Sequence, residues 1–414
     1  MLKTMNNIRL FSIIGVLKGA YFYIPIFSLY LLSAGVPLSA IVIGNIFWSL
    51  GAFIGEVPTG IFADTYGQKA AIVLGYLLEA LGMLIVFFHP SIPGLYVYYA
   101  VSGFAYSFLS GSEEALLYES VRHEKRTDFQ KVYGRFLSNE QLGFVSSSAL
   151  AGILYHFFGA TVFVPLLLAT SLSFFVATTL ACLLENHRAK IHNPSEGAGM
   201  WAVLRESASL IRRNEIILTL TIVSVLTVSG QYLLQAVYQP HFEAHGVPAL
   251  WIGLVVAFGT LLNALATRYI YILEKHLSLE KILLLINGTQ GVLFVLLAWL
   301  VHPAILVLLY IGAAGLFNLQ VPIVSDYINP RTSSHIRTTV LSGMSFIKRF
   351  FELFLGIALG KIVGLWGIEA SLLTQGMYLL LGIGISYYLL VRCGCAHKVE
   401  NPDGEQLEFS TQKP

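Results

Sequence analysis

The feature that most limits the fold of this chain is a series of apolar stretches about 20 residues long, the length that crosses the hydrocarbon core of a bilayer as a helix. Hydrophobic residues make up 56% of the 414 residues, and charged residues only 12%. A helix satisfies its backbone hydrogen bonds internally, as lipid surroundings require. The pattern therefore predicts an all-α membrane protein with twelve transmembrane helices. The predicted spans are 10–32, 39–62, 70–88, 94–115, 136–158, 161–184, 216–239, 250–271, 282–301, 304–325, 340–365 and 368–391.

Lysine and arginine fall on alternate connections between these spans. The basic connections include Lys69, the stretch 122–135 and the stretch 188–213. The connections between them contain no Lys or Arg around Pro37, Pro90, Ala160, Ala244, His302 and Gly367. Because cytoplasmic loops carry the excess of basic residues, both termini are predicted in the cytoplasm of a bacterium, with the protein in its inner membrane. The first span has no small-residue cleavage site and is interpreted as a retained helix.

The longest basic connection divides the chain into two sets of six spans. We expect an N-terminal bundle at 1–184, a cytoplasmic linker at 185–215, a C-terminal bundle at 216–391 and a cytoplasmic tail at 392–414. Trp201 and Leu204 fall on one helical face of the linker, with Arg205 elsewhere, which is typical of a helix lying in the membrane interface.

Between the second and third spans, residues 60–69 read GIFADTYGQK. This decapeptide resembles the G-x-x-x-D-x-x-G-x-K loop signature of the major facilitator superfamily. Gly60 is expected to allow close helix packing, and Gly67 a sharp reversal with positive φ. The resemblance implies the major facilitator fold, with two pseudo-symmetric six-helix bundles. It also implies that Asp64 approaches the start of the eleventh span near Thr338, where unpaired amides favour an anion.

Ionisable side chains within a membrane are costly and usually mark a function or a partner. Most of those in this chain lie in the cytoplasmic third of their spans, which predicts a gate of ion pairs. An alternative is a static network that anchors helix ends. The predicted gate and loop residues are Gly60, Asp64, Gly67, Lys69, Glu56, Glu119, Asp326, Lys348, Arg349 and Glu352.

Two ionisable residues lie deeper in their spans. Lys18 could serve a substrate or a proton, or form a structural pair with Glu56. Glu79 lies in the third span, which is peripheral in the resembled fold, and a hydrogen-bonded neutral carboxyl is expected there. Glu114 is favoured as proton carrier because the fourth span should present it to the cavity. The complete set of proton-coupling candidates is Glu114, Glu113, Glu140, Glu79 and Lys18.

By the same resemblance, the substrate should bind near midplane between the first, fourth, seventh and tenth spans. An aromatic and amide lining suits a small amphiphilic organic molecule, although each residue could instead hydrogen-bond a neighbouring helix. The cavity candidates are Tyr21, Tyr23, Tyr106, Gln231, Gln235, Tyr238, Asn263, Asn318 and Gln320.

These observations predict a monomeric secondary active transporter that works by alternating access. Proton-coupled efflux is favoured, and uptake of a metabolite is the alternative. Tyr99 stands where efflux members often carry an arginine, and 142–152 lacks their glycine-proline pair, so proton–drug antiport stays open.

The expected partners are a small solute, protons and the lipid bilayer, without nucleic acid or cofactor. A membrane-embedded enzyme is the other class considered, but no zinc H-E-x-x-H, nucleophile-elbow or phosphate-loop motif occurs. A channel or receptor would not carry the loop signature. No metal site is expected: His241 and His245 are interpreted as surface residues of an outer loop.

Overall fold

The protein, seen in a computed structural model, is described over residues 6–123, 129–185, 209–328 and 334–393, without the side chains of 57, 274, 322, 325, 326 and 334–342. Throughout these ranges the regular structure is helical, which confirms the predicted all-α membrane fold. The tail at 394–414 and most of the predicted linker, with Trp201, lie outside the described residues.

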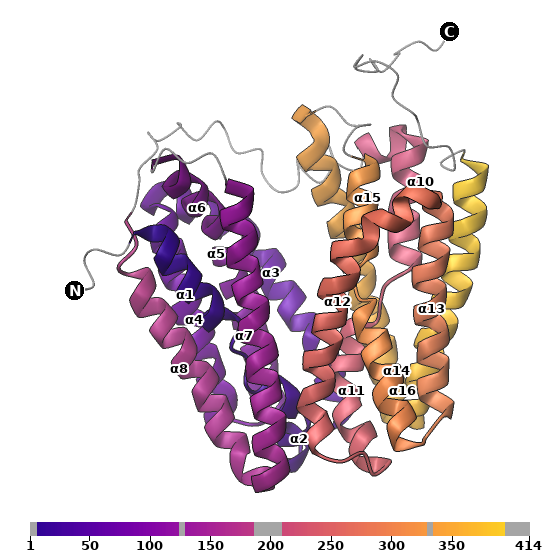
Figure 1. The fold of residues 1–414 in the computed structure, drawn as a ribbon, viewed down its shortest axis with the longest axis horizontal. Coiled ribbons are helices and arrows are strands. Elements are labelled where there is room, and N and C mark those ends of the chain that lie inside the picture. The colour runs from indigo at the N-terminus through magenta and orange to yellow at the C-terminus, as the bar shows by residue number, and fades with distance from the viewer. Residues whose placement is uncertain (1–5, 124–128, 186–208, 329–333, 394–414) are drawn as a thin grey trace.

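Two groups of helices stand side by side, and the start of α1 and the end of α16 lie on the same side of the molecule, which we call the side of the termini (Figure 1). The first group comprises α1 (Asn7–Gly19), η2 (Ile24–Ile26), α2 (Phe27–Ser33), α3 (Leu38–Tyr66), α4 (Gln68–Phe88), α5 (Ile92–Leu109), α6 (Ser112–His123), α7 (Phe129–Phe158), η3 (Gly159–Val162) and α8 (Phe163–Ala181). The second comprises α10 (Glu215–Leu226), α11 (Gln231–Ala244), α12 (Leu250–His276), α13 (Leu279–Trp299), α14 (Pro303–Gly315), α15 (Gln320–Ile328) and α16 (Ser334–Arg392).

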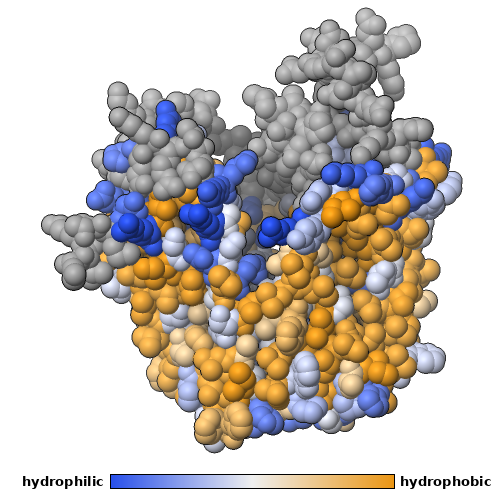
Figure 2. All heavy atoms as spheres, in the orientation of Figure 1, coloured by the Kyte–Doolittle hydropathy of each residue, from blue (hydrophilic) through white to orange (hydrophobic). Residues whose placement is uncertain are grey.

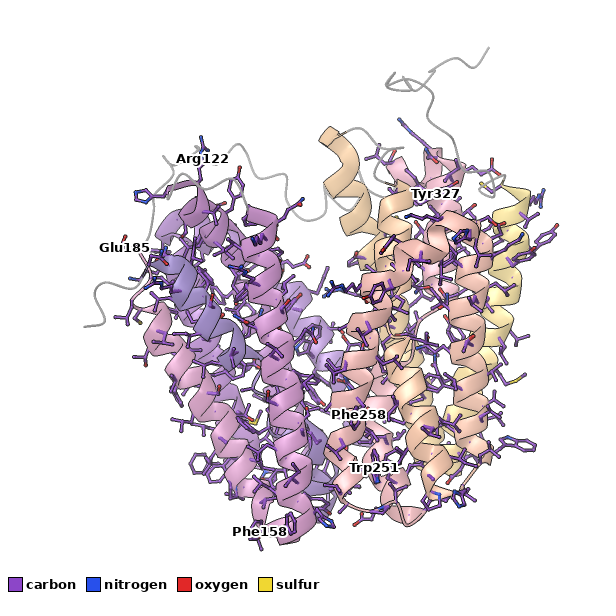
Figure 3. All side chains as sticks on the ribbon, viewed as in Figure 1. Arg122, Phe158, Glu185, Trp251, Phe258 and Tyr327 are labelled. Carbon is purple, nitrogen blue, oxygen red and sulfur yellow. The ribbon has the colours of Figure 1, made fainter. Side chains whose placement is uncertain are left out.

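Among the described residues, eight segments are long and apolar enough to cross a membrane, and two of them cover a pair of predicted spans each. The segment Phe129–Ala181 contains the turn η3, and the segment Gly343–Arg392 reverses at Gly367, whose φ is 88°. The arrangement is consistent with the predicted twelve helices. The outer surface in Figure 2 is a broad apolar band across both groups, with hydrophilic residues gathered near its two ends. Arg122 and Glu185 lie at the end near the termini, and Phe158 lies at the opposite end (Figure 3).

The first, fourth, seventh and tenth predicted spans are not continuous helices. Each is divided into two: α1 from α2, α5 from α6, α10 from α11, and α14 from α15. Three of the breaks contain a residue with positive φ, namely Gly111 (81°), Gly230 (65°) and Asn318 (57°). Glycine and asparagine tolerate this conformation best. The hydropathy of the sequence predicts these spans as continuous helices, because the residues at the breaks are mostly apolar or small.

The signature loop turns as predicted, but one of its glycines does not pack as predicted. Gly67 ends α3 with φ 96°, which confirms the expected reversal. A side chain at Gly60, in contrast, would meet nothing within 4 Å. In this conformation Gly60 therefore does not mediate close helix packing, because the two groups of helices are apart at that end.

Helices α1 and α7 touch through their backbones. A Cβ atom at Gly19 would lie 1.9 Å from the Glu140 carbonyl oxygen, and one at Gly143 would lie 2.1 Å from the Val16 carbonyl oxygen. No side chain fits at either position. The contact holds the lysine that precedes Gly19 beside the glutamate of α7.

Replacing Gly143 by valine is expected to lower the free energy of unfolding by at least about 1–3 kcal/mol, the usual cost of overpacking, because backbone cannot move aside as a side chain can. The control is Gly134→Val in the same helix, since a Cβ there meets nothing within 4 Å. Unfolding of both variants in detergent would be compared. Equal stability of the two variants would contradict the packing described.

The two groups meet on the side opposite the termini. There α7 packs against α12, α3 against α16, and α11 against α2. At the centre of the α7–α12 contact, a Cβ on Gly152 would lie 2.7 Å from the Gly253 Cα atom, and one on Gly253 would lie 2.1 Å from the Ser148 carbonyl oxygen. This side is closed by direct backbone contact.

Candidate functional site

A hollow separates the two groups of helices on the side of the termini (Figure 2). It leads to three cavities that share lining residues and have volumes of about 360, 190 and 370 Å³. We call them the α16 cavity, the tyrosine cavity and the amide cavity. The α16 cavity is lined by Lys348, Arg349 and Glu352 among others, the tyrosine cavity by Tyr23, Glu79 and Tyr98, and the amide cavity by Glu140, Gln235 and Asn263.

The tyrosine cavity contains a buried carboxyl from the third predicted span. Glu79 on α4 is 5% exposed and accepts a hydrogen bond from the Ser102 hydroxyl at 2.9 Å, and Tyr21 lines the same cavity. Beside it the hydroxyls of Tyr23 and Tyr98 lie 2.6 Å apart. Glu79 is therefore hydrogen-bonded as expected, but it faces the cavity, whereas the resemblance placed its helix at the periphery.

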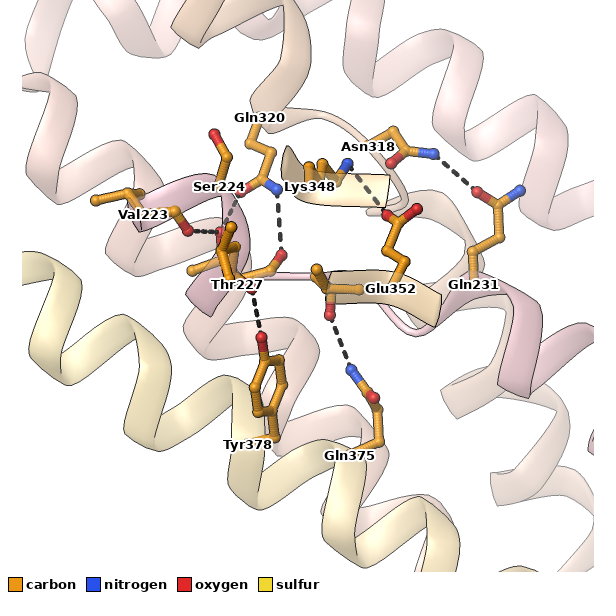
Figure 4. Close-up of polar contacts among 12 residues, drawn as sticks. Val223, Ser224, Thr227, Gln231, Asn318, Gln320, Lys348, Glu352, Gln375 and Tyr378 are labelled. Atoms are coloured by element: carbon orange, nitrogen blue, oxygen red, sulfur yellow. Dashed lines mark hydrogen bonds and ion pairs between the residues drawn. The ribbon is translucent and has the colours of Figure 1, made fainter. Parts of the chain in front are cut away.

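The breaks in the seventh and tenth spans place the amide groups. Asn318 adopts its left-handed conformation between α14 and α15, and its side-chain amide donates to the Gln231 side-chain oxygen at 2.7 Å (Figure 4). Asn263 on α12 donates to the carbonyl oxygens of Gly315 and Phe317, 3.1 and 2.8 Å away, at the end of α14. Gln231 and Asn318 border both the α16 and the amide cavity. A solute there would meet amide groups that are already held, Asn263 by the backbone of the break and Gln231 and Asn318 by each other.

Lys18 on α1 binds two carboxylates. Its amine lies 2.8 Å from a Glu113 oxygen and 3.1 Å from a Glu140 oxygen, and the Tyr76 hydroxyl donates a short hydrogen bond to the other Glu113 oxygen. The side chains of Lys18 and Glu113 are 14% and 8% exposed, whereas that of Glu140 is 29% exposed and borders the amide cavity. The expected pairing of Lys18 with Glu56 is thus wrong: α1 packs on α7 and contacts α6, and Glu56 is exposed.

The arrangement of a polar cavity between two helix groups can be compared with known proteins. A sequence model described as Major Facilitator Superfamily matches residues 10–350 of this chain. The chain belongs to that superfamily. The protein is accordingly a membrane transporter of small molecules and not an enzyme, as the sequence predicts.

Individual relatives of the transporter are distant in sequence. The Bacillus subtilis (strain 168) protein named uncharacterized MFS-type transporter YxaM is 22% identical over 366 residues, which cover 87% of this chain and 89% of that protein. A mutant of the nucleoside transporter NupG superposes with a TM-score of 0.78 at 15% identity, covering 94% of this chain and 100% of that chain. A bacterial homolog of the human lysosomal transporter Spinster, in an inward-facing and occupied conformation, has a TM-score of 0.69 at 11% identity, covering 95% and 98%. The structural likenesses show the fold alone.

Several residues of the predicted cavity occupy other places in the transporter. Gln320 is 5% exposed and bonds to Thr227, whose hydroxyl donates to it at 2.7 Å and whose carbonyl oxygen accepts from it at 3.1 Å. With Gln375 and Tyr378 on α16, it satisfies backbone oxygens near the break between α10 and α11 (Figure 4). Gln320 therefore hydrogen-bonds a neighbouring helix, which was the alternative to solute binding that the sequence left open for each cavity candidate.

Tyr238 and Tyr106 take different positions. Tyr238 is 1% exposed and donates to the Ile252 carbonyl oxygen at 3.1 Å, so only part of its ring reaches the amide cavity. Tyr106 is 41% exposed and borders the α16 cavity.

Glu114, the favoured proton carrier, does not face the three cavities. It lies in the first turn of α6 and is exposed. The break at Gly111 turns α6 away from the direction expected of an uninterrupted fourth span. Among the side chains that the structure describes, the carboxyls that border the cavities are Glu79, Glu140 and Glu352.

The predicted gate residues border the open side. Glu56 and Asp64 on α3 are exposed, and Lys69 begins α4 partly exposed. Lys348 and Glu352 form an ion pair at 3.6 Å within α16 and border the α16 cavity with Arg349. The side chains of Asp326 and Thr338 lie outside the described residues, and Glu119 is partly buried on α6.

Sequence reasoning missed three polar or aromatic residues that each border two cavities. Asn45 and Trp48 on α3 and Tyr232 on α11 border both the α16 and the tyrosine cavity. Asn45 carried a usable signal, because it is a lone amide in a long apolar helix. Tyr232 follows Gln231 directly, and only the break before α11 turns both toward the interior.

Proposed function

We propose that the transporter moves a small uncharged organic solute that combines a planar ring with several hydrogen-bonding groups. Trp48 and the tyrosines offer ring faces, and Gln231, Gln235 and Asn318 offer amide donors and acceptors in the joined cavities. Pockets of this kind orient a ligand by a few polar groups set among aromatic walls. This composition supports an amphiphilic solute.

We further propose that transport is coupled to protons. The observation that carries this proposal is the Lys18 amine shared by Glu113 and Glu140, with Glu140 at the wall of the amide cavity. One amine cannot fully balance two carboxylates, so a proton on Glu140 would relieve the excess negative charge. A solute that fills the amide cavity removes water from Glu140 and changes the balance between its two forms. Binding of solute and of proton would thereby be linked.

The proposed direction is export, with uptake as the second candidate. Export follows from the resemblance of the sequence to efflux members. The amide lining favours uptake, because a solute with many hydrogen-bonding groups crosses lipid poorly without a carrier. One solved relative in fold is named a D-xylose-proton symporter, with a TM-score of 0.65 at 12% identity over 92% of this chain and 96% of that chain. Nucleosides and pentoses are therefore first solutes to test beside planar amphiphiles.

The ionic gate also remains a proposal. In this conformation the side of the termini is open and Asp64 is exposed, as a released latch would be. We propose that the protein lies in a bacterial inner membrane with that side facing the cytoplasm. We also propose that it is a monomer and that residues 185–215 link its two bundles. Labelling of cysteines introduced at either end, in intact cells, tests the orientation.

Flux into proteoliposomes tests the function directly. Purified transporter would be reconstituted, and labelled candidate solutes supplied with and without a pH gradient of either sign. Accumulation against a concentration gradient only when a pH gradient is present would support proton coupling, and the sign of the effective gradient gives exchange or co-transport. Saturable flux that ignores both signs of the gradient would overturn the coupling and leave a facilitative carrier.

A further inference from the structure

On the side opposite the termini, three potential metal ligands meet outside the transport cavities. His241 and His245 lie one helical turn apart at the end of α11, and Glu369 follows the reversal of α16 at Gly367. One ligand atom from each residue lies within 4.8 Å of the other two. Imidazole and carboxylate are ligands that zinc accepts.

His241 supplies an observation that its packing leaves unexplained. The residue is 2% exposed, and its Nε2 atom has no hydrogen-bond partner among the described residues. An oxygen of Glu369 lies 4.0 Å away, which is too far for a hydrogen bond. A buried polar atom without a partner is costly, so this nitrogen calls for a ligand between itself and Glu369.

His245 is oriented as metal-binding histidines are. Its Nδ1 atom lies 2.8 Å from the His241 carbonyl oxygen. When Nδ1 donates its hydrogen to that oxygen, Nε2 is left with a free lone pair. Histidine ligands of metals commonly use one ring nitrogen for a backbone carbonyl in this manner.

Glu369 can complete the set because it is free to move. The side chain is 50% exposed, and Gly367, with φ 88°, would place a Cβ only 3.4 Å from one of its carboxylate oxygens. Ligands around tetrahedral zinc lie about 3.4 Å apart, given bond lengths near 2.1 Å. The present spacing of up to 4.8 Å would have to shrink by about 1.4 Å to match this geometry, and the half-exposed Glu369 is the side chain with room to change rotamer.

We infer that His241, His245 and Glu369 form a binding site for a zinc-like divalent cation on the side opposite the termini. Two nitrogens and one oxygen favour zinc over calcium or magnesium, which prefer oxygen ligands alone. A fourth position would be taken by water. The cation would tie the end of α11 to α16.

That tie bears on the closed side of the transporter. Two residues before His241, Gln239 of α11 borders the tyrosine cavity, donates to the Ile24 carbonyl oxygen at 2.8 Å and accepts from the Ser28 amide at 2.8 Å. These bonds join α11 to the first group of helices. A cation that fixes the end of α11 would stabilise the conformation in which they are made.

Zinc titration of the full chain tests the inference. The transporter would be purified without a polyhistidine tag, stripped with a chelator and titrated with zinc chloride by calorimetry. One equivalent per chain is expected, with a rise in melting temperature because the cation binds the folded form. His245→Gln and Glu369→Gln are both expected to weaken binding more than about tenfold, since even the loss of a supporting group around a metal costs 10–100-fold.

Matched controls separate this site from other surface groups. His302→Gln removes an exposed histidine of another loop, and Glu243→Gln removes the exposed glutamate between the two histidines on α11. Both are expected to bind zinc as the wild type does. No binding by the wild type, or equal affinity in His245→Gln, Glu369→Gln and the controls, would overturn the site. Because the readout is binding and melting, the result is independent of whether transport is proton-coupled.

Discussion

Replacing Glu140 by glutamine is expected to abolish accumulation driven by a pH gradient. If one proton moves per solute, a gradient of about 2 pH units provides about 2.7 kcal/mol, which corresponds to an accumulation of about 100-fold. Glutamine keeps the size and hydrogen bonding of the side chain but cannot carry the proton. The variant should therefore bring the solute only to equal concentrations, while exchange of labelled for unlabelled solute continues.

The measurement is uptake into proteoliposomes with an imposed pH gradient, followed by exchange without one. Glu114→Gln is the matched control, because Glu114 lies on the neighbouring α6 but outside the three cavities. It should accumulate solute as the wild type does. The reverse outcome, with Glu114→Gln inactive and Glu140→Gln normal, would return the proton to the residue that the sequence favoured.

Replacing Lys18 by methionine is expected to lower the free energy of unfolding by about 3–5 kcal/mol, the usual cost of removing one partner from a buried ion pair. Glu113 accounts for most of this cost, because its side chain is only 8% exposed and its carboxylate would be left buried without a cation. Glu140 reaches the amide cavity and can be hydrated there. Adding Glu113→Gln to the Lys18→Met variant should therefore recover a large part of the lost stability.

Unfolding in detergent, followed by denaturant or heat, gives the comparison. Lys361→Met serves as control, because this lysine is exposed on α16 and its loss should change stability little. A double variant no more stable than Lys18→Met alone would show that the two charges do not act on each other. Transport by the double variant, measured separately, would report on the role of the lysine in coupling.

Much of the fold could be predicted from the sequence, because the thickness of the bilayer requires apolar stretches of about 20 residues. Single polar residues do not obscure stretches of that length. The reversal at Gly67 was equally accessible, since a positive φ favours glycine in any context. The breaks at Gly111, Gly230 and Asn318 were not, because isolated small or polar residues inside apolar stretches leave hydropathy high. They depend on partners elsewhere, such as the Gln375 amide that binds the Val228 carbonyl oxygen.

The candidate site was predicted in kind but not in pairing. Amides and tyrosines of the predicted cavity set, such as Gln235 and Tyr21, do border the cavities, because polar groups in spans avoid lipid. The predicted partner of Lys18, Glu56, was wrong because the span that follows in the sequence was assumed to be the neighbour in space. Helix α7 faces α1 because Gly19 and Gly143 let the two backbones approach closely. The sequence alone does not show that these two glycines meet.

The contact between Gly152 and Gly253 has a mechanical consequence. Main chain meets main chain there, so at these two positions neither helix has a side chain that interlocks with the other. Helices that meet in this way can slide or separate without first withdrawing a side chain, so this contact adds little to the activation energy for opening. The resistance to reopening therefore comes from the packing and polar bonds around this contact, such as Ile43 of α3 against Gly360 of α16.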